Sequence, residues 1–321
     1  NIEGIFVAQD HMRIYNYGEY LSHLIGYINK PNRKELELPF IADMPDLDIG
    51  KEGLEKGFNP YLVGKAGQRE IEVNSYGRII REISRKDSTK GKDLQITIDL
   101  RIQKYASNLL NFHKAGSIVL MNIENGNILC MTSNPTYDPN KIIKKPNKEY
   151  WESILVNDLS PLTFRSVQGL YAPGSTFKMI VAIAALYHGV IDINSKFACN
   201  GKIGLGERLY HCWKNNGHGM MNVDSALKES CDVFFYEISK KVGIDKISKV
   251  AQDFGLGKIY DIQIQNQKKG IIPSKKWKKE NLDENWYPGE TLISAIGQGF
   301  VLTNPLQLAT MTCIIASEGS S

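Results

Sequence analysis

The sequence lacks several features that would each assign it to a broad class of protein. Its apolar run Met179–Leu186 is far shorter than the roughly 20 residues that span a bilayer. It contains no internal repeats, no low-complexity tract and no nucleic-acid-binding module. The formal net charge of +4 over 321 residues is modest. We therefore expect an ordinary globular protein whose function depends on local motifs.

The chain is long enough for two domains, because its 321 residues are 42% apolar and can fill two cores. One concentrated cluster of charge stands out, at Lys275-Lys276-Trp277-Lys278-Lys279. We expect this cluster to be a solvated, lysine-rich helix end. Contact with an anionic polymer, a membrane or a partner is the alternative interpretation.

The segment Tyr171–Lys178, with the sequence Tyr-Ala-Pro-Gly-Ser-Thr-Phe-Lys, carries the clearest chemical signal. Its proline and glycine favour a turn that exposes Ser175, and Met179–Leu186 predicts a buried helix behind the turn. Residues three apart share a helix face, so Lys178 lies near Ser175, and burial would favour its neutral amine as a general base. Backbone N–H groups at the helix start suit the oxyanion of a tetrahedral intermediate. The pattern predicts serine acyl transfer, although an isolated Ser-x-x-Lys also occurs as a helix cap with a surface lysine.

A second motif, Ser230-Cys231-Asp232, follows a predicted helix capped by Asp224 and precedes the apolar stretch Val233–Tyr236. Together with Ser175-x-x-Lys178, this order resembles the penicillin-binding proteins and the related β-lactamases. In that family a Ser-x-Asn-like triplet and then a Lys-Thr-Gly strand follow the nucleophile motif. Asp232 stands where Asn is commoner. The third motif is missing, because no Lys-[Ser/Thr]-Gly follows Ile296–Gly299, which is similar to the segment normally upstream of it.

Further segments narrow the resemblance to the class B penicillin-binding proteins. Leu94–Gln103 is similar to the entry of their transpeptidase domain. The Ser-x-Asp variant and Lys214–Gly219 resemble the penicillin-binding protein 2 branch, the elongation-specific transpeptidases. We expect from this resemblance that a membrane anchor and part of a pedestal precede Asn1, and that the Lys-Thr-Gly strand follows Ser321. Segments similar to the non-catalytic half of the family are Arg13–Gly18, His23–Tyr27, Gly50–Glu55 and Glu72–Arg78.

The pattern of apolar and polar residues changes at a charged linker, Arg85–Asp93, which divides the chain in two. Residues 1–93 alternate short apolar and polar stretches, which predicts a β-rich, non-catalytic pedestal similar to a dimerisation domain. Residues 94–321 begin with a predicted helix around Ile102–Leu110 and are expected to form the transpeptidase domain without its Lys-Thr-Gly strand. Asn125-Gly126 between two apolar runs predicts a hairpin. The expected fold class is α+β, the penicillin-binding transpeptidase fold, an antiparallel sheet flanked by helices that is C-terminally incomplete.

Three of the five cysteines lie close to one histidine in the sequence, in the pattern Cys199-x12-Cys212-x5-His218-x12-Cys231. Cys3His is an ordinary tetrahedral zinc set, although this spacing is not that of a standard zinc finger. We predict one structural zinc held by these four residues. A disulfide with free thiols is the alternative in an oxidising compartment, and His211 is a competing ligand. The resemblance adds that some penicillin-binding protein 2 enzymes carry a zinc near the active site.

The resemblance implies a peptidoglycan D,D-transpeptidase that cross-links stem peptides through a serine acyl-enzyme during cell elongation and is acylated by β-lactams. Ser175 is the expected nucleophile and Lys178 its base. Ser230 is expected to transfer protons to the amines, and Asp232 to orient Ser230 and Lys178. A septal class B transpeptidase, a β-lactamase or β-lactam sensor, and a non-catalytic morphogenesis scaffold are the alternatives.

The same resemblance implies a cellular setting and a set of partners. We expect a single-pass protein of the bacterial inner membrane with this chain in the periplasm. Peptidoglycan stem peptides and β-lactams are the expected ligands. Polymerase and morphogenesis proteins of the elongation machinery are expected to bind the pedestal, and no nucleic acid is expected to bind.

Overall fold

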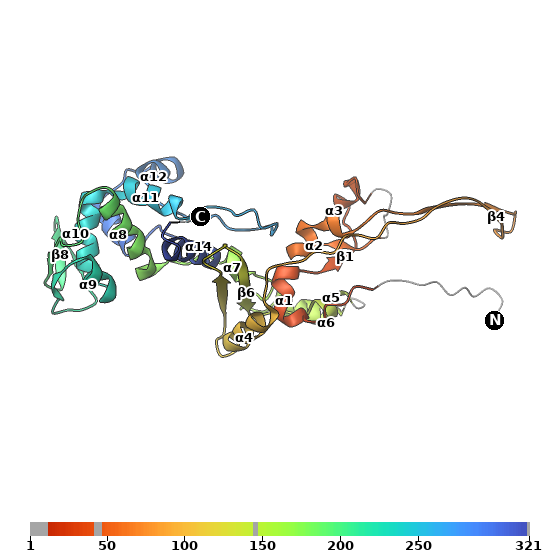
Figure 1. Ribbon diagram of the computed structural model, residues 1–321, viewed down its shortest axis with the longest axis horizontal. Coiled ribbons are helices and arrows are strands. Elements are labelled where there is room, and N and C mark those ends of the chain that lie inside the picture. The colour runs from red at the N-terminus through yellow and green to blue at the C-terminus, as the bar shows by residue number, and fades with distance from the viewer. Residues whose placement is uncertain (1–11, 42–46, 144–146, 320–321) are drawn as a thin grey trace. The chain divides into compact units, whose positions relative to one another are not determined.

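The computed structural model describes residues 12–41, 47–143 and 147–319, which form two compact units (Figure 1). Unit 1 takes the described residues of Asn1–Gly116, Met131–Phe164 and Asp261–Gln265. Unit 2 takes those of Ser117–Cys130, Arg165–Tyr260 and Asn266–Ser321. Compact packing units need not coincide with the domains of a family, so the division at residues 93 and 94 remains a prediction.

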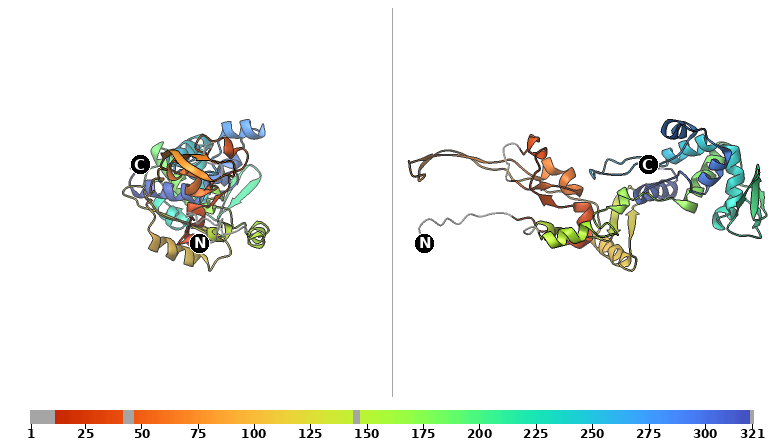
Figure 2. Two further views of the ribbon diagram at one scale, coloured as in Figure 1. Left: turned by 90° about the vertical axis from the view of Figure 1, so that its right-hand side faces the viewer. Right: turned by 180° about the vertical axis from the view of Figure 1, so that it is seen from behind.

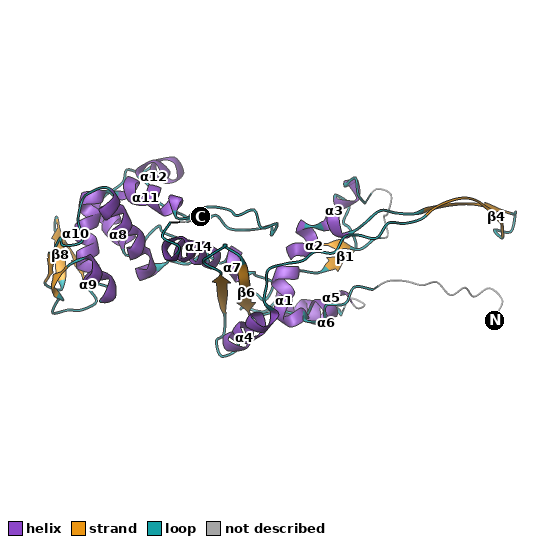
Figure 3. Cartoon of the chain, in the orientation of Figure 1, coloured by secondary structure: helices purple, strands orange, loops and turns teal. Residues whose placement is uncertain are grey.

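Unit 1 mixes short helices with two antiparallel strand pairs, β1 with β2 and β3 with β4 (Figure 3). The second pair forms a long ribbon that extends beyond α2 and α3 (Figures 1 and 2). Its residues are almost all exposed, and the cross-strand ion pairs Arg69–Glu82 and Arg81–Glu72 lie along it. The elements are α1 Gly18–Ile25, β1 Ile28–Asn29, the 3-10 helix η1 Glu35–Glu37, β2 Ile49–Gly50, α2 Gly53–Gly57, α3 Asn59–Leu62, β3 Gln68–Val73, β4 Ile79–Lys86, α4 Leu100–Leu110, α5 Pro139–Ile143 and α6 Lys148–Leu155.

Helix α4 confirms the helix predicted around Ile102–Leu110. Asp99 caps it, because its side chain accepts hydrogen bonds from the backbone N–H groups of Arg101 and Ile102. Inside unit 1, the fully buried Gln103 donates from Nε2 to Tyr20 O and Met131 O, and its Oε1 accepts from Met131 N. A buried amide with all these groups paired links α4 to its neighbours at little desolvation cost.

The predicted hairpin is also confirmed: β5, Gly116–Met121, pairs with β6, Ile128–Asn134. Gly126 in the turn has φ +71°, a conformation that glycine adopts without strain, and Asn122 N donates to Asn127 O. Each sheet among the described residues has two strands, so helices supply most of the core of unit 2.

Unit 2 is built around α8, Lys178–Tyr187, which is buried on most of its surface, as the apolar run Met179–Leu186 predicts. Helix α10, Asp232–Val242, packs beside it and buries Phe234 and Phe235. Within the described ranges, no helix combines the length and the apolar character needed to cross a bilayer. The remaining elements are α7 Arg165–Gln168, the 3-10 helix η2 Gly174–Phe177, β7 Phe197–Cys199, β8 Lys202–Leu205, β9 Arg208–His211, β10 Gly219–Met221, α9 Val223–Lys228, α11 Ile244–Asp253, α12 Lys275–Leu282, α13 Pro288–Ala295 and α14 Pro305–Ala316.

Candidate active site

Ser175 lies in the short 3-10 helix η2 and leads directly into α8. Gly174, with φ +57°, makes the turn that precedes it. Ser175 is exposed, whereas Phe177 and Lys178 are both 1% exposed. The turn therefore presents one hydroxyl to solvent and turns a lysine into the protein, as the motif predicts.

The amino group of Lys178 is buried and has three hydrogen-bond acceptors. Its Nζ donates to Ser230 O at 2.9 Å, to Ser230 Oγ at 2.9 Å and to Asp232 Oδ1 at 2.6 Å. A protonated amine has three N–H groups, so these acceptors match the donors of the charged form that Lys178 takes after it accepts a proton. The ring of Phe235 lies 5.6 Å from Nζ and closes the site on that side.

Ser230 lies between the lysine and the nucleophile. Its Oγ donates to Ser175 Oγ at 2.9 Å, while it accepts from Lys178 Nζ. The sequence predicts that Lys178 lies near Ser175 as its base, and the described hydrogen bonds connect the two residues through Ser230. Such a chain of two hydroxyls and an amine can pass a proton in either direction.

The backbone of the second motif explains how Ser230 makes these contacts. Ser230 has φ +51°, in the left-handed region that non-glycine residues seldom adopt. It lies two residues beyond the last residue of α9, Lys228. This helix is capped by a capping box of Asn222 and Ser225, and not by Asp224 as predicted. The left-handed turn allows the carbonyl and the hydroxyl of Ser230 to contact the same ammonium.

Asp232 occupies the first turn of α10, where the helix dipole stabilises a carboxylate. Its Oδ1 pairs with Lys178, and its Oδ2 accepts from the backbone N–H of Trp213 at 3.0 Å. The family resemblance implies that Asp232 orients Lys178, and the two side chains form an ion pair in the structure. Trp213 carries no catalytic signal in the sequence, because it contributes a backbone group.

The segment Ile296–Gly299 lies against the turn that carries Ser175. Gly174 N donates to Gly297 O at 3.0 Å, and Gly297 has φ +68°. A Cβ on Gly297 would lie 2.2 Å from Gly174 O, so this position has room only for glycine. Farther along, Tyr171 and Thr303 exchange backbone hydrogen bonds of 2.8 and 2.9 Å.

The four residues predicted to bind a metal lie together in unit 2. Their ligand atoms, three Sγ atoms and a histidine nitrogen, are all within 4.8 Å of one another. Antiparallel pairing of β7 with β10 brings Cys199 beside Gly219, the residue after His218. The other two ligands come from the ends of neighbouring elements, Cys212 after β9 and Cys231 at the N-cap of α10.

The distances in this cluster match a tetrahedral zinc site. His218 Nδ1 lies 3.6 Å from Cys199 Sγ and 3.5 Å from Cys212 Sγ. With Zn–S of about 2.3 Å and Zn–N of about 2.0–2.1 Å, a tetrahedron requires an S···N edge of about 3.6 Å. The cysteines of the cluster are free, so the alternative of a disulfide is not formed in the part of the chain that the structure describes. The competing ligand His211 is exposed on β9 and is not among the four clustered residues.

The protonation of the cluster also suits a metal that binds thiolates and neutral imidazole. Burial raises the pKa of the Cys231 thiol to about 12. Burial also acts to raise the pKa of Cys199, but backbone hydrogen bonds at Gly201 and His218, together with the side chains of Cys231 and Cys212, leave this pKa below its usual value. Burial and the nearby charge of Lys214 lower the pKa of His218, which favours the neutral ring. A dication would supply the charge that stabilises the thiolate of Cys231.

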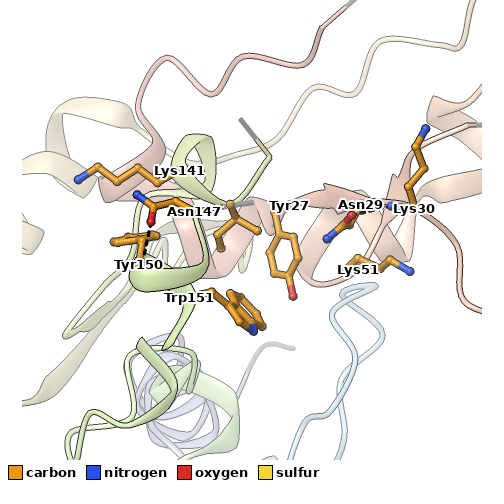
Figure 4. A pocket seen from close by; sticks show the side chains of 9 residues that line it. Tyr27, Asn29, Lys30, Lys51, Lys141, Asn147, Tyr150 and Trp151 are labelled. Carbon is orange, nitrogen blue, oxygen red and sulfur yellow. Dashed lines mark hydrogen bonds between the residues drawn. The ribbon is translucent and has the colours of Figure 1, made fainter. Parts of the chain in front are cut away.

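A separate hollow of about 400 Å³ lies in unit 1 and shares no residue with the Ser175 site (Figure 4). Tyr27 and Trp151 face it with rings 6.3 Å apart. Of its three lysines, Lys30 pairs with Asp48 and Lys51 pairs with Glu35, so two of the cations are neutralised. Of these two sites, the one in unit 2 is therefore the one that combines a nucleophile, an amine and a carboxylate.

Comparison with known proteins agrees with this geometry. Residues 116–321 match the penicillin-binding protein transpeptidase domain, and residues 1–96 match the penicillin-binding protein dimerisation domain. The chain is 35% identical over 323 residues to the peptidoglycan D,D-transpeptidase MrdA of Escherichia coli K12, covering 98% of this chain and 51% of the relative. It thus spans about half the length of the curated relatives it matches.

Solved structures show the same fold. The penicillin-binding protein PBP2 of Helicobacter pylori, solved in complex with MreC, superposes with a TM-score of 0.89 at 31% identity, over 95% of this chain and 57% of that one. A chain of a peptidoglycan synthase complex that coordinates polymerization and crosslinking superposes with a TM-score of 0.81 at 32% identity, over 92% of this chain and 54% of that one. The expected fold class and the resemblance to penicillin-binding protein 2 are thereby confirmed. The chain belongs to the penicillin-binding protein transpeptidase family.

Proposed function

We propose that this chain carries the acylation site of a peptidoglycan D,D-transpeptidase that acts during cell elongation. The observation that carries the proposal is the continuous hydrogen-bond chain from exposed Ser175 through Ser230 to buried Lys178, which is held by Asp232. The similarity to a D,D-transpeptidase over almost the whole chain supports the same chemistry.

The reaction follows from the geometry. Ser175 Oγ attacks the carbonyl of the penultimate D-alanine of a stem peptide. Its proton passes to Ser230, and the hydroxyl proton of Ser230 passes to Lys178, which accepts it as the neutral amine and becomes the ammonium. The same chain returns a proton to the nitrogen of the terminal D-alanine as the C–N bond breaks. An amine of a neighbouring stem then attacks the acyl-enzyme, giving up a proton along the same route and releasing Ser175. A β-lactam acylates the same oxygen, because its strained amide occupies the place of the D-Ala-D-Ala bond.

The test is covalent labelling of the full-length protein with a fluorescent penicillin, followed by mass spectrometry of the labelled peptide. We expect a single penicilloyl adduct on Ser175 that is absent from the Ser175→Ala variant. Ser195→Ala is the matched control, since this serine lies in the turn before β7, outside the site. A long-lived adduct supports a transpeptidase and rapid deacylation supports a β-lactamase. An adduct on another residue, or normal labelling of Ser175→Ala, contradicts the proposal.

We also propose that Cys199, Cys212, His218 and Cys231 hold one structural zinc that positions the second motif. Two short connections support this role. Cys231 lies between Ser230 and Asp232 and is fully buried, and Cys212 precedes Trp213, whose backbone N–H binds Asp232. A closed site of four protein ligands supplies folding free energy to the segments that it joins.

The zinc proposal is tested by elemental analysis after purification without chelators. We expect about one zinc per chain, and we expect Cys212→Ser to lower the zinc content, the thermal stability and the rate of acylation together. Cys313→Ser is the matched control, because Cys313 lies on α14 away from the cluster. Less than about 0.2 zinc per chain, or a disulfide between two of the four residues in active protein, contradicts a metal site of this kind.

The setting of the whole protein is proposed on the same similarity. We propose a single-pass anchor in the bacterial inner membrane, with this chain in the periplasm. Unit 1 would bind morphogenesis and polymerase proteins, because similar proteins have been solved with MreC and within a peptidoglycan synthase complex. Membrane fractionation and in-cell crosslinking from the exposed ribbon β3–β4 test these two statements. Recovery of the full-length protein in the soluble periplasmic fraction contradicts the anchor, and crosslinks to neither class of protein contradict the partner surface.

A further inference from the structure

Lys278 is a buried cation of unit 2 outside the hydrogen-bond chain of the catalytic site. The lysine-rich run predicts a solvated helix end, and Lys275, Lys276 and Lys279 on α12 have side chains 61–82% exposed. Lys278 is different, because its side chain is only 1% exposed. The prediction is therefore wrong for one lysine of the four, and that lysine needs a structural reason for its burial.

The partners of Lys278 lie at the start of α13. Its Nζ donates to Glu290 Oε1 at 2.6 Å and to Asn285 O at 2.9 Å, and it pairs with Glu284 Oε2 at 3.1 Å. Glu290 belongs to the capping box of α13, since its Oε2 accepts from Tyr287 N at 2.8 Å. Lys278 thus holds the capping-box glutamate in the first turn of α13, and breaking such a pair leaves a carboxylate without its cation.

The same ammonium also lies near two aromatic rings from the two ends of α13. It is 4.8 Å from the ring centre of Tyr287, the N-cap, and 5.8 Å from that of Phe300, beyond the C-terminal end. The indoles of Trp277 and Trp286 pack on Phe300 with ring centres 5.4 and 6.3 Å apart. Phe300 is held within a cage of a cation and aromatic rings.

Phe300 lies three residues after Gly297, the glycine that touches the turn that carries Ser175. Gly297 packs on the peptide unit formed by Gly174 C=O and Ser175 N–H, and its own carbonyl accepts from Gly174 N. A shift of residues 297–300 would therefore rotate the peptide plane that carries the Ser175 N–H. That N–H adjoins the oxygen on which the tetrahedral intermediate forms, so its direction controls how well it stabilises the oxyanion.

We propose that Lys278 is a positioning residue for acylation: it fixes α13 and Phe300, and through Gly297 it aims the peptide N–H of Ser175. This inference rests on the proposed acylation at Ser175. According to this inference, Lys278 stabilises the transition state of acylation and does not change the binding of the β-lactam or stem peptide.

The test compares Lys278→Met and the milder Glu290→Gln with the exposed control Lys276→Met in the full-length protein. Glu290→Gln keeps the size of the side chain and one of its two acceptor oxygens, so it can still accept from Lys278 or from Tyr287 N, but it removes the charge. We expect the maximal acylation rate at saturating β-lactam to fall about tenfold in Lys278→Met, with the half-saturating concentration within about threefold of wild type. Glu290→Gln should change the same rate in the same direction by less, and Lys276→Met should match wild type.

A second measurement does not depend on enzyme activity. Amide hydrogen exchange at Gly174, which donates to Gly297 O, should be about tenfold faster in Lys278→Met and Glu290→Gln, while amides of α10 stay protected. If wild type is not acylated but exchange at Gly174 responds, the proposed function fails, while the structural coupling of Lys278 to the turn that carries Ser175 stands. Unchanged exchange at Gly174 in both variants overturns the inference. The inference is also overturned if a smaller fraction of each variant can be acylated while that fraction reacts at the wild-type rate. That result would mean that Lys278 affects stability alone.

Discussion

Removal of the Asp232 carboxylate tests whether the ion pair with Lys178 organises the site. Lys178 is 1% exposed and Asp232 is 14% exposed at the side chain, so the pair is almost free of solvent screening. Asp232→Ala leaves the ammonium with the two oxygens of Ser230 and leaves Trp213 N without its acceptor. We therefore expect a loss of both stability and reactivity.

The magnitude follows from the contacts. Removing one partner of a buried ion pair costs about 3–5 kcal/mol, and an unpaired backbone N–H adds about 1 kcal/mol. Ser230 still solvates part of the charge, so we expect a net loss near 4 kcal/mol. For a unit of this size each kcal/mol lowers the melting temperature by about 2–4 °C, which gives a decrease of about 10 °C.

The assay pairs thermal unfolding with the rate of β-lactam acylation, on protein kept well below its melting temperature. Asp232→Asn is the informative companion, because an amide oxygen still accepts a hydrogen bond although the charge is lost. We expect it to lose about 1–2 kcal/mol, between wild type and Asp232→Ala. Asp224→Ala is the control, since Asp224 is exposed on α9. The reasoning is refuted if Asp232→Ala melts within about 2 °C of wild type and acylates within about threefold of its rate.

Three other outcomes are expected. Lys178→Ala should slow acylation of Ser175 by several orders of magnitude in rapid-mixing experiments, because a nucleophile and its proton acceptor act as a unit; a loss below about tenfold contradicts that role. Gly201→Ala should reduce zinc content and cost more than about 2 kcal/mol on thermal unfolding, since Gly201 has φ +85° and its Cβ would lie 1.9 Å from Asn215 O; an unchanged melting temperature contradicts the packing. Zinc uptake at pH 7.5 should release a proton from Cys231, whose pKa of about 12 keeps the metal-free thiol protonated, so affinity should fall as the pH falls; calorimetry in buffers of different protonation enthalpy that shows no release contradicts a thiolate ligand.

The elements that the sequence predicts correctly are those set by local chemistry. The apolar run after Lys178 requires a buried helix, and Asn125-Gly126 favours a tight turn whatever surrounds it. The Cys3His group could be found because its residue types alone define a metal preference, although their spacing spans several strands. Each of these signals depends on a few neighbouring residues or on donor type.

The parts that could not be predicted depend on contacts between distant segments. Nothing in the sequence distinguishes Lys278 from the lysines beside it, because its burial depends on Glu290 and Phe300. The hydrogen bond from Trp213 N to Asp232 is equally hidden, since any residue except proline offers a backbone N–H. Tertiary contacts determine both the burial of Lys278 and the hydrogen bond of Trp213 N, and a local sequence pattern does not reveal such contacts.

The conformation of Ser230 depends both on a local sequence motif and on tertiary contacts. A serine at φ +51° is strained, and strain of this size persists only where surrounding contacts determine the backbone. Here the contacts are the Lys178 ammonium on one side and the buried, metal-suited thiol of Cys231 on the other. If Ser230 relaxed to an extended backbone, its carbonyl and hydroxyl would no longer reach the same ammonium, and the path from Ser175 to Lys178 would be broken. The strained serine therefore lies where the proposed proton relay and the proposed metal ligand occupy adjacent residues.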